Sequence, residues 1–81
     1  MKGNGKLYRP IEPVYTVVGD KIRDRRKSLK LGLRDVAKAS GVDFRYIFRV
    51  ENANIRGSLS ALRKIAKGLE TTLSELLQGI G

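Results

Sequence analysis

The stretch SGVD, residues 40–43, constrains the fold more than any other feature, because it separates two short amphipathic segments, 33–40 and 44–52. Gly41 can adopt the positive φ of a sharp turn at no steric cost. Asp43 is a good helix N-cap, and its charge suits the positive end of the helix dipole. Helices of about two turns are unstable alone in water. Both segments must therefore be held by packing within one small domain.

Five α-helices and no strand are expected. Apolar residues recur with a helical period between glycine-containing breaks, and Thr16 and Ser58 are suitable N-caps for two of the segments. The helices are expected at residues 16–29, 33–40, 44–52, 59–69 and 73–78. The fold class is therefore all-α, and the second and third helices with their glycine turn form a helix-turn-helix arrangement.

The first of these helices has an incomplete apolar stripe. Val18, Ile22 and Leu29 share one face, and either Arg25 or Arg26 fills the missing turn. The outer face is expected to be basic, with Lys21, Arg23 and Lys27.

Residues 1–15 are expected to form an extended basic arm, and residues 16–81 the domain. Both prolines of the chain lie in the arm, and proline disfavours helix at the residue before it. Lys2, Lys6 and Arg9 could enter a DNA minor groove, as basic arms do. A disordered arm, or one that folds across a partner subunit, explains the same composition.

The composition excludes several classes of site. The chain has no cysteine and no histidine, which excludes Cys/His zinc sites and histidine-based triads. Its eight acidic residues are spread singly. We therefore expect no enzyme activity, metal, cofactor or small-molecule ligand. No apolar run approaches the ~18 residues that span a bilayer, and the N-terminus lacks a secretory apolar region. A cytoplasmic protein without membrane contact is expected.

The charge points to a polyanionic partner. The formal net charge is +9 for 81 residues, which favours nucleic acid or an acidic membrane surface. Residues 1–30 carry nine basic and three acidic side chains, so the excess is concentrated in one part of the chain. A general solubility charge would be more evenly distributed.

Four stretches are similar to the phage-repressor/Cro (XRE-type) helix-turn-helix family: GDKIRDRR, LRDVAKASGVD, RYIFRVEN and SLSALRKIAKGLETTLSELL. They cover roughly residues 17–77 and fall in register without a gap. The resemblance implies a compact five-helix, lambda-repressor-like domain that binds double-stranded DNA, usually as a homodimer and usually as a transcription regulator.

The chain departs from the family pattern at several positions. Gly32 and Leu33 stand where the family usually has a Ser or Thr cap and a phosphate-bonding Gln. Arg34 is a candidate substitute for that phosphate contact. Ala53 and Glu70 each occupy a position where glycine is usual, and Gly68 lies inside the fourth helix instead.

The third helix carries the candidate base-reading residues. With Ile47 toward the core and 100° per residue, Arg45 and Arg49 lie on the opposite face. Arginine can donate two hydrogen bonds to guanine, and an apolar side chain can touch the thymine methyl group. The predicted readers are Phe44, Arg45, Phe48 and Arg49. Alternatively, the phenylalanines are a satellite of the core and the arginines a solvated face.

Other polar side chains near this helix are predicted to contact phosphates, which position a protein without specifying sequence. They are Arg34, Lys38, Tyr46, Asn52, Asn54 and Arg56. Tyr46 is expected to be half packed, with its hydroxyl free for a phosphate. Loop polarity alone could account for Asn54 and Arg56.

The family resemblance also implies an ion pair. Glu51 is expected to point inward, which is unfavourable for an unpaired carboxylate. The arginine late in the first helix, Arg26, is its implied partner. This pair would brace the third helix against the first and would have no catalytic role.

The C-terminal apolar residues are the candidate homodimer surface: Leu73, Leu76, Leu77 and Ile80. Two-fold dimers bind half-sites about 34 Å apart. Alternatively, Leu73 and Leu76 close the core and leave only Leu77 and Ile80 exposed.

The sequence therefore favours a sequence-specific transcription regulator of repressor or controller type, with helix 44–52 in the major groove of a palindromic operator. Two other functions are compatible with it. One is a protein-interaction module, as in an antitoxin or a co-activator. The other is a nonspecific nucleic-acid or membrane-surface binder driven by charge.

Overall fold

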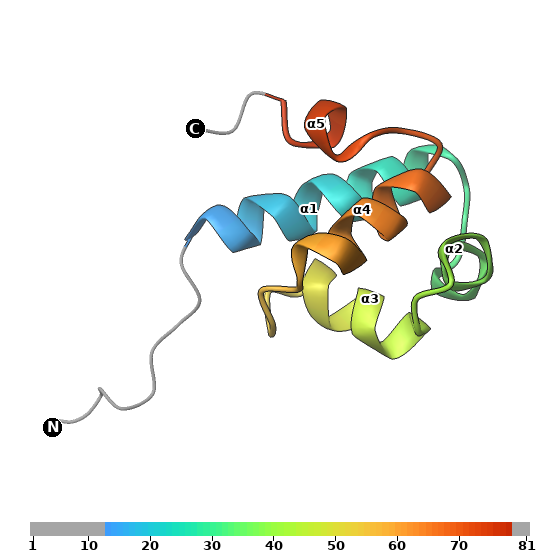
Figure 1. Cartoon of the computed structure of the whole chain (residues 1–81), viewed down its shortest axis with the longest axis horizontal. Helices are drawn as coiled ribbons and strands as arrows, with labels where there is room; N and C mark the ends of the chain where they lie inside the picture. The colour runs from blue at the N-terminus through green and yellow to red at the C-terminus, as the bar shows by residue number, and fades with distance from the viewer. Residues whose placement is uncertain (1–12, 79–81) are drawn as a thin grey trace, which may run out of the picture.

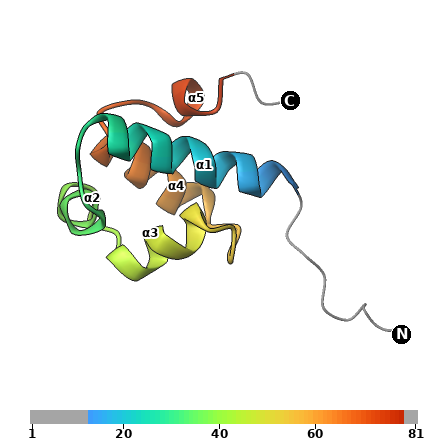
Figure 2. The ribbon, with the colours of Figure 1, turned by 180° about the vertical axis from the view of Figure 1, so that it is seen from behind.

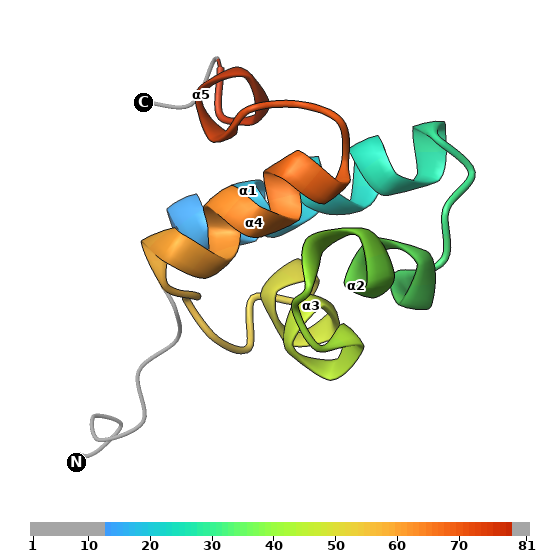
Figure 3. The same ribbon diagram turned by 45° about the vertical axis from the view of Figure 1, so that its right-hand side comes forward.

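The computed structural model describes residues 13–78, and every regular element within that range is an α-helix. All three ribbon views place α3 and α5 on opposite sides of α1 and α4 (Figures 1, 2 and 3). The helices are α1 (Pro13–Ser28), α2 (Leu33–Ser40), α3 (Phe44–Glu51), α4 (Leu59–Gly68) and α5 (Leu73–Leu76).

One hydrophobic core joins all five helices. α1 packs on α3, and α2 packs on both α3 and α4. Ile22, Val36, Ile47 and Ile65 are fully enclosed at its centre, each with 0% of its surface exposed. Because each short helix contributes only one or a few buried residues, each depends on its neighbours for stability. The remaining buried hydrophobic residues are Val18, Val50, Leu62, Ala66, Leu69 and Leu76.

The first helix begins earlier than the sequence pattern indicated. It starts at Pro13 rather than Thr16, so residues 13–15 belong to α1 and not to the predicted arm. Proline suits a first helical position, because its missing N–H would have no partner there and its φ is already helical. Residues 1–12, with Lys2, Lys6 and Arg9, lie outside the described range. The helix α2 has its predicted bounds, whereas α3, α4 and α5 end one or two residues before their predicted ends.

Two glycines allow helices to approach closely. A Cβ on Gly19 would lie 2.5 Å from the Val50 carbonyl oxygen, where α1 meets the end of α3. A Cβ on Gly68 would lie 2.9 Å from the Ser40 Cβ, where α4 meets the end of α2. The glycine inside α4, a departure from the family pattern, is therefore required by helix packing.

Arginines of α1 bond the carboxyl ends of other helices. Arg25 donates from Nε to the Leu69 carbonyl at 2.9 Å and from Nη2 to the Glu70 carbonyl at 3.1 Å. Arg23 donates from Nη2 to the Glu51 carbonyl at 2.6 Å and is only partly exposed. Its predicted place on the outer basic face was wrong. These bonds satisfy carbonyls that have no partner within their own helices.

Candidate nucleic-acid interface

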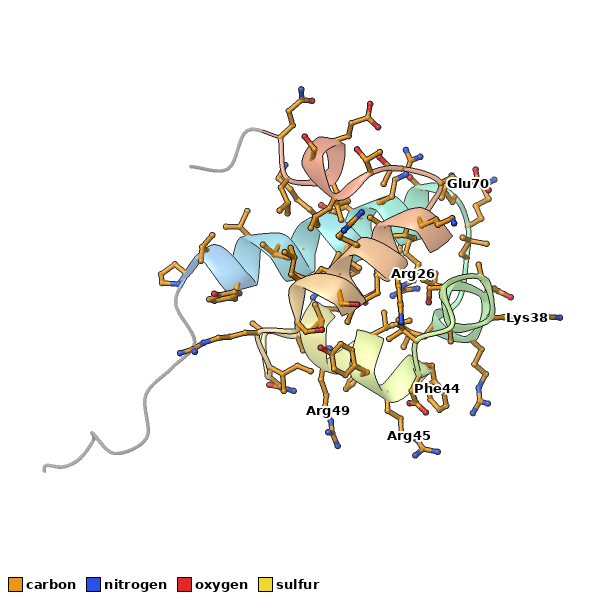
Figure 4. The ribbon with its side chains drawn as sticks, in the orientation of Figure 1. Arg26, Lys38, Phe44, Arg45, Arg49 and Glu70 are labelled. Carbon is orange, nitrogen blue, oxygen red and sulfur yellow. The ribbon has the colours of Figure 1, made fainter. Side chains whose placement is uncertain are left out.

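The third helix, α3, has one buried face and one exposed basic face. Ile47, Val50 and Glu51 are buried, whereas Arg45 and Arg49 are exposed. Figure 4 shows both arginines projecting from α3 away from the rest of the domain. Phe48 also remains 50% exposed. The outer face of α3 is therefore free to meet a partner.

The turn before α3 is fixed by local hydrogen bonds. Gly41 adopts φ +77°, and its N–H donates to the Ala37 carbonyl at 2.8 Å, which ends α2. The Asp43 carboxylate accepts from the Arg45 N–H at 2.7 Å and caps α3. At the other end of α2, Gly32 has no capping side chain, but its N–H donates to the Asp35 carboxylate at 2.7 Å. The start of α3 is thus fixed by a side-chain cap, and the start of α2 is fixed by Asp35 in place of the usual capping residue.

Phe44, the first residue of α3, lies beneath two arginines. The Cζ of Arg34 is 4.2 Å from the centre of its ring, and the Cζ of Arg45 is 5.4 Å away. The phenylalanine is half-buried. Arg34 comes from the first turn of α2, so this stack connects the starts of the two helices.

Glu51 and Arg26 form a bidentate ion pair beneath α3. Arg26 donates from Nε to Glu51 Oε2 at 2.7 Å and from Nη2 to Oε1 at 3.0 Å. Its Nη1 also donates to the Leu31 carbonyl at 3.0 Å. Hydrogen bonding to Glu51 raises the pKa of the Arg26 guanidinium, against the opposing effect of burial. The pair fixes α3 against α1 and leaves the outer face of α3 unengaged.

The predicted phosphate contacts come from α2, from α3 and from the segment after α3, and they differ in how free their polar groups are. Arg34, Lys38, Asn54 and Arg56 are exposed. Asn52 caps the end of α3, and its Nδ2 donates to the Phe48 carbonyl at 2.8 Å.

The Tyr46 hydroxyl is only partly free, whereas the sequence pattern predicted a free hydroxyl. It accepts a hydrogen bond from the Ser58 N–H at 2.8 Å. Its own proton remains available to an acceptor, because a phenol both donates and accepts. Arg56 lies over the Tyr15 ring, with its Cζ 5.9 Å from the ring centre, which places the start of α1 beside the loop after α3.

A family model described as helix-turn-helix matches residues 22–76, which include α2, α3, their turn and α4. The chain belongs to the helix-turn-helix family. It is also similar to the restriction-modification controller protein C.AhdI from Aeromonas hydrophila, known from a high-resolution crystal structure. The identity is 28% and the TM-score 0.76, over 80% of this chain and 98% of that chain. No curated protein sequence matches the chain significantly.

These matches confirm the all-α, XRE-type helix-turn-helix domain inferred from the sequence. They identify the chain as a DNA-binding protein of the transcription-regulator class. In a helix-turn-helix protein the second helix of the motif enters the major groove. That helix is α3, whose outer face carries the exposed arginines.

The candidate dimer surface of this helix-turn-helix chain is smaller than predicted. Leu76 is only 7% exposed and belongs to the core of its own chain, so it is not free to contact a second subunit. Leu73 and Leu77 are partly buried against the same core and keep some exposed surface. Ile80 lies outside the described residues.

Sequence reasoning missed the residues that connect one element to another. Arg34 was predicted as a phosphate contact, but its position over Phe44 was not foreseen. Either Arg25 or Arg26 was expected to fill a gap in the apolar stripe, and the bond of Arg25 to the end of α4 was not foreseen. The run of arginines at 23, 25 and 26 was a usable signal, because closely spaced arginines on one helix face several neighbours at once.

A groove of about 760 Å³ lies between α4 and α5, away from α3, and is lined by Leu59, Arg63, Lys64, Lys67 and Leu73, among others. Among residues 13–78, no cluster of three or more acidic, histidine or cysteine side chains could hold a metal ion. No helix in that range is long and apolar enough to cross a membrane.

Proposed function

We propose that this protein is a sequence-specific transcription regulator that binds a palindromic operator as a homodimer, with α3 in the major groove. The observation that carries the proposal is the exposed face of α3, where Arg45 and Arg49 project outward together (Figure 4). Side chains at the start of such a helix contact base edges. The likeness to a restriction-modification controller protein favours a regulator of controller type.

Base contacts are assigned to the outer face of α3. Arg45 and Arg49 would each donate a pair of hydrogen bonds to guanine N7 and O6. Phe48 is the better placed phenylalanine for a thymine methyl group, because it is 50% exposed while Phe44 is half-buried beneath Arg34.

Phosphate contacts are assigned to the polar side chains around that face. Three of them would bind DNA phosphates: Arg34 and Lys38 on α2, and Arg56 after α3. The arginines would each donate two hydrogen bonds, and the lysine would act as a point charge. Tyr46 would donate its remaining hydroxyl proton. Asn52 and Asn54 complete the set.

The homodimer is assigned to the end of the domain formed by α5. Leu73 and Leu77 keep exposed apolar surface there, and Ile80 follows them in the sequence. The two copies of α3 would then face successive major grooves, about 34 Å apart. We expect Leu77→Lys to shift the protein toward monomer in sedimentation experiments while its melting curve stays cooperative.

Selection of bound sites from random duplexes tests the function. We expect a palindrome whose half-sites are one helical turn apart. Arg45→Ala and Arg49→Ala should each lower affinity for that site by about 1–3 kcal/mol per half-site and relax preference at one base pair in each half-site.

Arg63→Ala on α4 is the matched control, because it removes the same charge from the groove away from α3. It should leave base preference unchanged. Equal affinity of the native protein for unrelated duplexes would show a nonspecific binder instead.

A further inference from the structure

Two arginines from different helices converge on one aromatic ring at the start of α3. The Cζ atoms of Arg34 and Arg45 lie 4.2 Å and 5.4 Å from the centre of the Phe44 ring. Arg34 belongs to α2 and Arg45 to α3. Figure 4 shows Phe44 and Arg45 at the same edge of the domain.

We propose that Phe44 is a positioning residue, which holds the Arg34 and Arg45 guanidinium groups together so that they bind DNA as one unit. Arg45 would read a guanine while Arg34 holds the neighbouring phosphate. This inference rests on the proposed function and assigns Phe44 a role other than contact with a base.

The ring is suited to this role by its chemistry and its burial. Guanidinium groups are attracted to the face of an aromatic ring and stack on it. Phe44 is half-buried, whereas both arginines are exposed. A long exposed arginine otherwise loses much rotational freedom when it binds, and ordering it beforehand reduces that loss.

The charges near the ring indicate an anionic ligand. Two guanidinium groups beside one ring repel each other unless a negative charge lies between them. The nearest carboxylates in sequence are already engaged with backbone N–H groups, Asp35 with Gly32 and Asp43 with Arg45. Within residues 13–78, every ion pair involves Arg23 or Arg26 and none involves Arg34 or Arg45. A DNA phosphate beside a guanine edge supplies the missing acceptors.

Replacing Phe44 separates positioning from direct contact with a thymine methyl group. Leucine keeps an apolar side chain but has no ring face, whereas tyrosine keeps the ring. On the operator selected for the native protein, we expect Phe44→Leu to lower affinity about tenfold. The guanine preference at the base pair read by Arg45 should weaken with it. Phe44→Tyr should restore most of the affinity and the preference.

The arrangement can also be tested without DNA. The ring current of Phe44 should shift the side-chain NMR signals of Arg34 in the free protein. Phe44→Leu should abolish this shift, while circular dichroism shows that the helices remain. An Arg34 signal at its ordinary position in the native protein would overturn the proposal.

A double-mutant cycle keeps the proposal testable even if Phe44→Leu fails to fold. Arg34→Ala and Arg45→Ala change exposed side chains only. If the two groups act as one unit, their effects on operator affinity will not be additive. Additive effects would overturn the positioning role.

Three further outcomes tell this proposal apart from the proposed function. Unchanged affinity and base preference in Phe44→Leu would overturn the positioning role alone, as would loss of a thymine preference with the guanine preference intact. A native protein without any preferred sequence would overturn the proposed function as well.

Discussion

At the scale of single residues, Glu51 shows how a buried charge fixes the reading helix. Only 3% of its surface is exposed, and Arg26 bonds both of its carboxylate oxygens. Removing Arg26 leaves this buried carboxylate with Arg23 alone, whose Nε lies 3.8 Å from Glu51 Oε1. Loss of the closer partner of a buried pair is destabilising, whereas replacing both partners is often tolerated. We expect Arg26→Met to lower the free energy of unfolding by about 3–5 kcal/mol.

The double variant Arg26→Met/Glu51→Leu is the control, and it should lose less stability than the single variant. Urea denaturation measures both. Equal losses would mean that packing of the arginine, rather than its charge, is what matters at this site.

The same pair predicts how this contribution depends on pH. Hydrogen bonding to Glu51 raises the pKa of Arg26. When the pKa of a group is higher in the folded state, its contribution to stability is complete at any pH below the unfolded-state pKa. The contribution is lost only as pH rises through the folded-state pKa. The ordinary arginine pKa is already far above neutrality. The stability difference between native protein and Arg26→Met should thus be constant from about pH 7 to pH 9. A steady decline over that range would point to another titrating group.

Ala53 adopts a backbone conformation that glycine would adopt more easily. Its φ is +57°, and Glu70 has φ +61°. At both positions, where the family usually has glycine, the backbone is left-handed although the residue is not glycine. L-residues are disfavoured in that conformation by about 1–2 kcal/mol, so replacing one with glycine relieves strain. Glycine also raises the conformational entropy of the unfolded chain, which cancels part of the stabilisation. We expect Ala53→Gly to stabilise the domain by roughly 0.5–1 kcal/mol in thermal or urea unfolding.

Gly41→Ala is the matched opposite change, because Gly41 has φ +77° and a Cβ added there would meet open space. It should destabilise by about 1 kcal/mol through backbone strain alone. If both variants shifted stability in the same direction, backbone conformation would not be the cause.

Residue contacts could be predicted only where burial demanded a partner. The inward position of Glu51 follows from the helical period once Ile47 faces the core, and the family resemblance implied Arg26 as its partner. The stack of Arg34 on Phe44 depends on the distance between two helices. A helical period gives the direction of each side chain but not that distance. For the same reason the sequence left two roles open for Leu76, contact with a second subunit or closure of the core, and the structure has it in the core.

At the scale of elements, close helix crossings determine where α3 lies. A Cβ at Gly19 would be 2.5 Å from the Val50 carbonyl oxygen and 2.6 Å from that of Glu51. In an ordinary helix, Gly→Ala is favourable by about 1 kcal/mol. Here the contacting atoms are backbone and cannot move separately from α3, and overpacking costs about 1–3 kcal/mol or more. We expect Gly19→Ala to lower both stability and operator affinity.

Gly32→Ala is the control, since its Cβ would meet only the Asp35 carboxylate, at 3.4 Å. It should be nearly neutral in melting and binding experiments. A Gly19→Ala protein with native affinity would show that the α1–α3 crossing can relax without moving the reading face.

The helices themselves were predicted well because their starts are chemically marked. Asp43 and Ser58 cap α3 and α4, as expected. The error at α1 arose because Thr16 was a plausible cap, while Pro13 serves as the first helical residue. Local sequence does not decide between two acceptable starts. In the extra turn, Pro13 and Val14 are exposed, and Tyr15 lies under Arg56.

At the scale of the whole molecule, a net charge of +9 attracts DNA from any direction, so charge alone does not show which face binds.

The salt dependence of binding shows which charged side chains contact phosphates. Removal of one phosphate contact should reduce the slope of log K against log salt by about 0.9. We expect Lys38→Gln to reduce the slope by about 1.8 in a dimer, because Lys38 is exposed and projects outward from α2, the helix that precedes α3 in the motif (Figure 4). Lys67→Gln is the control variant, because it removes an equal charge from the groove beside α5. Screening at about 0.1 M salt limits charge effects to roughly 10 Å, so Lys67→Gln should leave the slope almost unchanged. Equal changes in both variants would mean that the protein binds DNA through its overall charge and not through an oriented α3.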